Sequence, residues 1–183
     1  MIVGIEGGLG SGKTLLMVRY LVKDSLQDKP IFANFGLKRI KYNPLDIMDI
    51  LKMDKEEVNL TNMSIAIDEI TVFADCRASM SKMNKLISYF ILQTRKRNVT
   101  FYYTTQDITM VDKRLEHHTD IRVCAEKIYH KNKKKETVEL ENYRKYMIID
   151  LRNHRKPIWN TFVLDISKYF NFYDTDEIIL PPV

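Results

Sequence analysis

The feature that most constrains the fold is a glycine-rich stretch, GIEGGLGSGKTLL at residues 4–16. It matches the pattern G-x-x-x-x-G-K-[ST], whose fixed places are taken by Gly7, Gly12, Lys13 and Thr14. The apolar run IVGI comes before the loop and LLMV comes after it. The sequence therefore predicts a strand, a glycine-rich loop and a helix in that order, which is the context that the pattern requires.

The predicted loop offers several groups that bind phosphate. Glycine tolerates positive φ and close approach, so the backbone can curl with its N–H groups inward as an anion nest. The helix N-terminus adds partial positive charge, Lys13 can reach the β- and γ-phosphates, and the Thr14 hydroxyl can ligate Mg²⁺. We therefore expect ATP with Mg²⁺ as the ligand. The loop residues expected to hold the nucleotide are Gly7, Gly8, Leu9, Gly10, Ser11, Gly12, Lys13 and Thr14.

Two other interpretations of the stretch are weaker. A glycine-rich turn with an ordinary surface lysine rarely has strand and helix patterning on its two sides. The dinucleotide-binding spacing G-x-G-x-x-G does not occur, because Gly8 and Gly10 are followed by Lys13 where a third glycine should stand. Binding of a nucleoside triphosphate is thus the favoured interpretation.

A second motif, SIAIDE at residues 64–69, is an apolar strand that ends in two acids. We expect Asp68 to hold the hydration shell of Mg²⁺ opposite Thr14, and Glu69 to polarise the attacking water. Two acids after a strand are also common at helix N-termini. The catalytic interpretation therefore depends on the glycine-rich loop being present in the same chain.

Gln106 ends the next predicted strand, VTFYYTT at residues 99–105. Polar residues at the carboxyl ends of parallel strands face the ligand crevice, so Gln106 is a candidate sensor of the γ-phosphate. A capping glutamine in a loop is the alternative. His117 and His118 have no partners at metal-ligand spacing and are expected at the surface.

Strand and helix patterns alternate along the first part of the chain. Strands are expected at residues 2–5, 31–33, 63–70, 99–105 and 121–125, and helices at 12–24, 44–53, 80–97 and 110–120. This order predicts an α/β fold with a mainly parallel sheet and helices on both of its faces.

The pattern changes after residue 125. A lysine-rich turn lies between two β-like segments, and residues 158–166 and 169–180 are typical of strands. A chain of 183 residues fits one domain. We expect a single domain with its core at about residues 1–125 and a strand-rich extension at about residues 126–183.

The formal net charge of +5 is concentrated in three short segments: RKR at 95–97, HKNKKK at 130–135 and RNHRK at 152–156. Each segment alone is typical of a solvated loop, but together they are consistent with contacts to a nucleic-acid backbone. The candidate DNA contacts are Lys131, Lys133, Lys134 and Lys135.

Two further features concern the compartment. No run of residues approaches the ~20 apolar residues of a membrane-spanning helix, and no signal peptide precedes the first strand. The two cysteines, Cys76 and Cys124, lack metal or redox spacing, which favours a reducing environment. We expect a cytoplasmic protein, inside the host cell if it is viral, or one associated with a virion.

Beyond its glycine-rich loop, the chain contains IDE at residues 67–69 and TRKRNVTFYYTTQD at residues 94–107. With this set of motifs it resembles the FtsK-HerA superfamily of P-loop ATPases. Within that superfamily it is similar to viral genome-packaging ATPases and to the Zot-like assembly ATPases of filamentous phages. The resemblance covers residues 1–125, and FYDTDE at residues 172–177 resembles the end of Zot-type ATPase domains more weakly.

The resemblance implies a RecA-like core and a homo-oligomeric ring, for which a hexamer is one candidate. It also implies ATP bound between subunits and double-stranded DNA in a central channel. Lys13, Thr14, Asp68, Glu69 and Gln106 match the family's motifs. A virion shell or portal component is a further candidate partner.

The resemblance also implies an arginine that acts on the neighbouring subunit's nucleotide. Arg95 matches best, because it lies in the basic pair eleven residues before Gln106. Arg97, Arg114 and Arg122 are the other candidates, and each is also compatible with a cation at a helix C-terminus. The adenine contacts stay open between Tyr143, Tyr146 and Tyr173, all of which packing would also explain.

The sequence favours an ATP-hydrolysing DNA translocase, in particular a genome-packaging motor. A Zot-like ATPase for virion assembly or extrusion is the first alternative, and the absence of a following membrane-spanning segment favours packaging over it. A small nucleotide or nucleoside kinase is the second, although residues 130–135 are lysine-rich where a kinase lid is arginine-rich. A nucleotide-dependent switch is the third, although N-K-x-D is absent.

Overall fold

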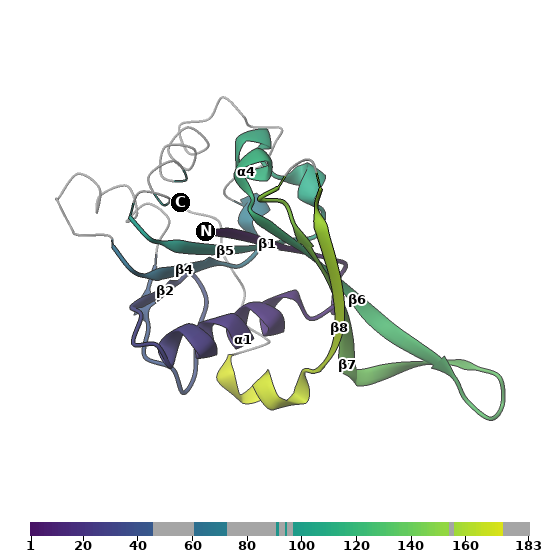
Figure 1. Ribbon diagram of the computed structural model, residues 1–183. Helices are drawn as coiled ribbons and strands as arrows, with labels where there is room; N and C mark the ends of the chain where they lie inside the picture. The colour runs from purple at the N-terminus through teal and green to yellow at the C-terminus, as the bar shows by residue number, and fades with distance from the viewer. Residues whose placement is uncertain (46–60, 73–90, 92–93, 95–96, 154–155, 174–183) are drawn as a thin grey trace.

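The computed structural model describes residues 1–45, 61–72, 91, 94, 97–153 and 156–173. Its elements, in chain order, are β1 (Ile2–Glu6), α1 (Lys13–Ser25), β2 (Ile31–Ala33), β3 (Asn43–Pro44), β4 (Ser64–Ile67), η1 (Ile70–Val72), β5 (Thr100–Thr105), η3 (Ile108–Met110), α4 (Lys113–His118), β6 (Ile121–Lys131), β7 (Thr137–Asp150), β8 (Ile158–Asp165) and η4 (Ser167–Phe172). Figure 1 shows α1 and η4 on one side of the sheet and α4 on the other.

The described strands form one sheet in the order β3-β2-β4-β5-β1-β6-β7-β8. The first six strands in this order, β3 through β1 to β6, run parallel to one another. β7 runs antiparallel to β6, and β8 runs antiparallel to β7. The predicted α/β class with a mainly parallel sheet and a strand-rich extension is therefore confirmed. Because β5 lies between β1 and β4, the glycine-rich loop and the two acids leave the sheet two strand positions apart, at the same edge.

The central strands are apolar along their whole length because both of their faces are covered. Every residue of β1, β4 and β5 is buried. Alternate residues of β1 enter different cores: Val3 and Ile5 pack with the apolar stripe of α1, whereas Ile2 packs with Leu115 of α4. This packing fixes the register of β1 and hence the position at which the loop begins.

The C-terminal part of the chain extends the same sheet. β6 is continuous from Ile121 to Lys131, so it crosses the boundary expected at residue 125. In Figure 1 the β6–β7 hairpin projects beyond the body of the molecule, and β8 lies along β7. That residues 1–183 form a single domain, with a core at about 1–125 and an extension at about 126–183, stays a prediction.

One predicted strand is wrong in its described part. Residues 169–180 were expected as a strand, but Ser167–Phe172 form a 3₁₀ helix, η4. The Asp165 carboxylate accepts hydrogen bonds from the Ser167 amide and hydroxyl at 3.1 and 2.6 Å, which turns the chain after β8. Tyr169 and Phe172, three residues apart, then pack against the core on the α1 side.

Several other expected elements can be placed only in part. The helix expected at 110–120 is shorter, since α4 begins after Asp112, whose side chain accepts from the Arg114 amide at 2.9 Å. The helix expected at 44–53 is wrong at its start, because Asn43–Pro44 form β3, and its residues 46–53 lie outside the described residues. Most of the helix expected at 80–97 also lies outside them, as do Cys76 and Arg95.

Candidate nucleotide-binding site

The glycine-rich loop joins the carboxyl end of β1 to the start of α1, as predicted. Gly12 is the residue before α1 and has φ 86°, a conformation that favours glycine. Gly7 approaches the backbone of β6 so closely that an added Cβ would lie 2.4 Å from the Ala125 carbonyl oxygen. The loop is closed by the Ser11 amide, which donates to the Gly8 carbonyl at 3.2 Å.

Lys13 is positioned over the loop and toward the acids. Its side chain is 7% exposed, and Nζ donates to the Gly8 carbonyl at 3.3 Å. The same nitrogen lies 3.8 Å from Oε1 of Glu69. The ammonium group therefore links the loop to the second motif across the sheet edge.

The residues of the loop fit a phosphate group. Among the side chains that the structure describes, the Ser11 hydroxyl is the buried polar atom without a hydrogen-bond partner. A buried hydroxyl without a partner is costly, and a phosphate oxygen is a suitable acceptor for it. This hydroxyl, Lys13 and the N-terminus of α1 together are groups that suit the binding of an anion.

Asp68 joins the loop to the second motif. The Thr14 hydroxyl lies 3.1 Å from both carboxylate oxygens of Asp68, and the Thr104 hydroxyl donates to Oδ1 at 2.5 Å. Burial raises the pKa of Asp68, while the hydrogen bonds from Thr104 and Thr14 and the charge of Lys13 oppose this shift. A carboxylate beside a threonine hydroxyl is a donor set that Mg²⁺ prefers.

Two residues that the sequence analysis did not single out hold Asp68 in place. Asn34, directly after β2, accepts from the Asp68 amide at 2.8 Å and donates to the Asp68 carbonyl at 3.2 Å. Thr104, near the end of β5, accepts from the Glu69 amide at 2.8 Å. Both are polar residues at the ends of predicted parallel strands, and that signal could have identified them.

Glu69 follows Asp68 in a left-handed conformation, with φ 49°. Its side chain is 29% exposed and lies beside Lys13. Burial raises the pKa of Glu69, the charge of Lys13 lowers it, and the charge of Asp68 raises it again. A half-buried carboxylate with a raised pKa is suited to polarise water. Gln106 lies at the end of β5, between the loop and the acids, and is exposed.

Two candidate arginines are paired within the chain. Arg122 Nε donates to Oε1 of Glu6 at 2.6 Å, and Arg114 pairs with Asp112 at 3.1 Å. Arg97 lies in the turn before β5, and Arg95 is outside the described residues.

The candidate tyrosines differ in their surroundings. Tyr146 is fully buried and stacks on Phe162 at 5.3 Å, so it packs in the core. Tyr173 packs edge-on against Phe35, with ring centroids 6.5 Å apart. Tyr143 is exposed. Packing therefore accounts for two of the three candidate adenine contacts, Tyr146 and Tyr173.

The four candidate DNA contacts come together at one place. Lys131 ends β6, and Lys133, Lys134 and Lys135 follow in the turn to β7, all of them exposed. Asn132 shapes the turn by accepting from the amides of Lys134 and Glu136, both at 2.9 Å. The lysines thus form a basic tip on the projecting hairpin (Figure 1).

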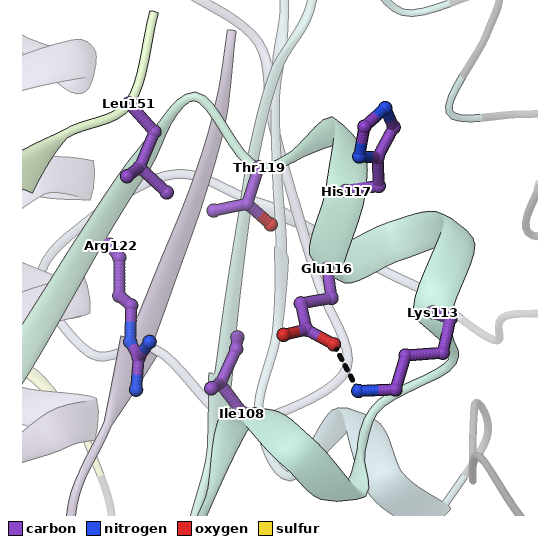
Figure 2. Close-up of a pocket in the computed structure, with 7 residues that line it drawn as sticks. All are labelled: Ile108, Lys113, Glu116, His117, Thr119, Arg122 and Leu151. Carbon is purple, nitrogen blue, oxygen red and sulfur yellow. Dashed lines mark hydrogen bonds and ion pairs between the residues drawn. The ribbon is translucent and has the colours of Figure 1, made fainter. Parts of the chain in front are cut away.

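A separate cavity of about 550 Å³ lies on the α4 side of the sheet. Figure 2 shows Arg122 of β6 facing Glu116 and Lys113 of α4, with Glu116 and Lys113 paired at 2.7 Å. His117, expected at the surface, is exposed at its rim. Among the described residues, its lining includes neither the glycine-rich loop nor the two acids.

The strand order and the positions of the loop and the two acids are those of a RecA-like P-loop fold. The sequence matches no protein-family model and no curated protein. Comparison with solved structures finds clear similarity. The N-terminal domain of zonular occludens toxin from Neisseria meningitidis has a TM-score of 0.63 at 19% identity, with 94% of this chain and 98% of that chain covered.

The genome packaging NTPase B204 from Sulfolobus turreted icosahedral virus 2, in complex with AMP, has a TM-score of 0.57 at 13% identity. That comparison covers 87% of this chain and 96% of that chain. The same NTPase is also known in complex with ATP-gammaS. The predicted resemblance to packaging and Zot-like ATPases is thereby confirmed at the level of the fold. No helix within the described residues is both long enough and apolar enough to cross a membrane.

Proposed function

We propose that this protein hydrolyses ATP with Mg²⁺ at the site formed by the loop and the two acids. The observation that carries the proposal is the contact of Thr14 with both oxygens of Asp68 at 3.1 Å, because it joins two motifs 54 residues apart. The buried Ser11 hydroxyl, which has no hydrogen-bond partner, supports a phosphate ligand. The genome packaging NTPase B204, which has a similar fold, is known in complex with ATP-gammaS.

Each residue has a definite task in this proposal. The loop amides and Lys13 would bind the β- and γ-phosphates, and Thr14 and Asp68 would hold Mg²⁺. When bound there, the metal would neutralise charge that develops on the phosphates. Glu69 accepts a hydrogen bond from the attacking water and orients it, and Gln106 contacts the γ-phosphate.

We further propose that hydrolysis drives movement of double-stranded DNA, as in a genome-packaging motor built as a ring. The basic tip of the β6–β7 hairpin supports this step, since it concentrates positive charge away from the nucleotide site. An arginine from a neighbouring subunit, Arg95 first among the candidates, would complete the site. The protein would then act inside the host cell, with a virion shell or portal as its docking partner.

A Zot-like role in virion assembly is the second candidate function. The observation that favours it is the similarity to the zonular occludens toxin domain, which spans nearly the whole of both chains. Both candidates require ATP hydrolysis and differ in their response to DNA. A packaging motor is expected to be stimulated by double-stranded DNA, whereas an assembly ATPase is not.

The test is the ATPase rate per subunit measured against protein concentration, with and without double-stranded DNA. We expect the rate per subunit to rise with concentration, because an arginine supplied in trans can add ~10³-fold or more. Lys13→Ala should lose binding and hydrolysis, and Glu69→Gln should lose hydrolysis alone. A rate independent of concentration and of DNA would contradict the ring motor, and phosphorylation of an added nucleoside would indicate a kinase.

A further inference from the structure

Arg144 of β7 is a buried charge in direct contact with the glycine-rich loop. The residue is 7% exposed, and Nε donates to the Gly10 carbonyl at 3.0 Å across 134 residues of sequence. One terminal nitrogen of its guanidinium group pairs with Oε1 of Glu139 at 2.9 Å. The other donates to the carbonyls of Leu140, Glu141 and Tyr143 at 3.1, 2.9 and 2.9 Å. All three guanidinium nitrogens are therefore engaged.

These carbonyls belong to an interruption in the hairpin. β6 and β7 pair regularly up to Lys127 and Arg144, and the next register pair is Tyr129 with Glu139. Residues 140–143 of β7 thus lie opposite a single β6 position, which is a bulge larger than the usual one extra residue. Backbone carbonyls released from a ladder need other donors, and the planar fork of an arginine supplies several at fixed angles.

The bulge divides the hairpin into a base and an outer part. The outer part consists of Tyr129–Lys131 paired with Thr137–Glu139, together with the turn that carries the basic tip. Glu139, the residue of this outer part that adjoins the bulge on β7, pairs with Arg144 and also with Lys127, the latter at 3.1 Å. The Lys127 side chain in turn lies beside Gly10, 3.2 Å from the place of an added Cβ.

The peptide between Gly10 and Ser11 is the point at which this arrangement meets the phosphate site. A trans peptide is planar, so its carbonyl and its N–H point in opposite directions and turn together. Arg144 holds the Gly10 carbonyl, while the Ser11 amide on the other side closes the loop onto Gly8. A phosphate that takes the Ser11 N–H would therefore also move the carbonyl that Arg144 holds.

We propose that Arg144 is a positioning residue that couples nucleotide binding in the glycine-rich loop to the outer part of the β6–β7 hairpin. The proposal rests on the proposed nucleotide binding but not on DNA. Bound nucleotide fixes the orientation of the peptide after Gly10. Because Arg144 contacts the Gly10 carbonyl, the bulge carbonyls and Glu139, this fixed orientation also restrains the bulge. The outer part of the hairpin, which carries the basic tip, therefore becomes more ordered.

Amide hydrogen exchange with mass spectrometry tests this proposal, using a non-hydrolysable ATP analogue with Mg²⁺. In the unaltered protein, nucleotide should slow exchange both in residues 7–14 and in residues 137–145. In Arg144→Gln the response of the loop should persist with about tenfold weaker affinity, because a charge-assisted hydrogen bond is removed. The response of the hairpin should disappear. Arg144→Lys should not restore it, since an ammonium lacks the fork.

Lys145→Gln is the matched control, because Lys145 points to the other face of β7 and pairs with the exposed Glu126 at 3.1 Å. It should behave as the unaltered protein. Glu139→Gln leaves the contact of Arg144 with Gly10 in place, and it provides the same test if Arg144→Gln fails to fold. In this variant the nucleotide-induced slowing of exchange in residues 137–145 should weaken, while the affinity for the nucleotide should not change. A protected loop with an unresponsive hairpin in the unaltered protein would overturn the coupling. Absence of loop protection there would instead overturn the proposed nucleotide binding.

Discussion

Asp68 illustrates at the scale of one residue how function opposes stability. It is buried, its backbone is held by Asn34, and its carboxylate is reached by the hydroxyls of Thr14 and Thr104. These neutral donors orient the carboxylate without neutralising it, and the ammonium group of Lys13 acts at longer range. An ionised group in such a place is costly until a cation is bound.

Asp68→Asn should therefore stabilise the nucleotide-free protein at neutral pH. Burial raises the pKa of Asp68 above its ordinary 3.8, so the folded chain binds this proton more tightly than the unfolded chain. Stability is then lost as the pH rises through the raised pKa. Thermal unfolding followed by circular dichroism should show a Tm advantage for the variant that grows from acidic to neutral pH.

Asp107→Asn is the control with the opposite sign. Hydrogen bonds from the Thr109 amide and hydroxyl lower the pKa of Asp107. Its contribution is present above the ordinary pKa and lost as the pH falls, so this variant should be the less stable one at neutral pH. An advantage of Asp68→Asn that is constant or shrinks with rising pH would contradict the account.

Thr104 has a role that the same reasoning can test. Its hydroxyl donates to Asp68 and accepts from the Glu69 amide, so it orders both acids. Thr104→Val should reduce kcat/KM for ATP by ~10²-fold, because small displacements of catalytic groups are costly. The Mg²⁺ concentration for half-maximal rate should rise. Thr105→Val removes an equally buried hydroxyl that donates to the Asp107 carbonyl instead, and equal losses in the two variants would contradict this role.

At the scale of elements, β7 acts as a platform for the glycine-rich loop. Side chains two residues apart point to the same face of a strand, and here Arg144 and Tyr146 both reach loop carbonyls. The Tyr146 hydroxyl donates to the Gly12 carbonyl at 2.9 Å, and its ring stacks on Phe162 of β8. Residues of the extension, beyond residue 125, therefore support the glycine-rich loop.

Tyr146→Phe should separate the contribution of the hydroxyl, which contacts Gly12, from that of the ring, which stacks on Phe162. The stacked ring stays, but the hydrogen bond to Gly12 is removed, so we expect a rise of several-fold in KM for ATP and a decrease of ~1 kcal/mol in the free energy of unfolding. Phe162→Leu is the matched variant, because it removes the stacking partner and keeps the hydroxyl. It should lower stability at unchanged KM, and urea unfolding with steady-state kinetics measures both quantities. A KM that moves in Phe162→Leu but not in Tyr146→Phe would contradict the platform.

At the scale of the whole molecule, positive charge and nucleotide site lie at different places on one sheet. Replacing Lys133, Lys134 and Lys135 by alanine should weaken binding of double-stranded DNA and flatten its dependence on salt by ~0.9 in log–log slope for each phosphate that is no longer neutralised. Nucleotide affinity should not change. Alanine at the exposed Lys38, Lys41 and Lys168 removes the same charge elsewhere, and should leave the slope unchanged. Equal effects of the two triple variants, measured by fluorescence anisotropy, would contradict a dedicated tip.

The sequence predicts the contacts that are local or tied to a motif. The loop, the acids after β4 and the order of strand and helix in residues 1–33 follow from short patterns, and the position of Gln106 follows from the end of β5. Arg144 could not be found in this way, because its partner Gly10 is 134 residues distant and nothing in its neighbourhood indicates a bulge. η4 was missed since aromatic residues suit a strand, and only the Asp165–Ser167 turn and packing on α1 reverse that preference.

The central claim is that the glycine-rich loop and Asp68 form one site for a nucleoside triphosphate with Mg²⁺. Isothermal titration calorimetry of the folded protein with ATP and Mg²⁺ tests it most directly. The account predicts saturable binding at one site per chain, retained in Glu69→Gln and abolished in Lys13→Ala. Titration that shows no uptake by the folded, unaltered protein, or undiminished uptake by Lys13→Ala, would contradict it.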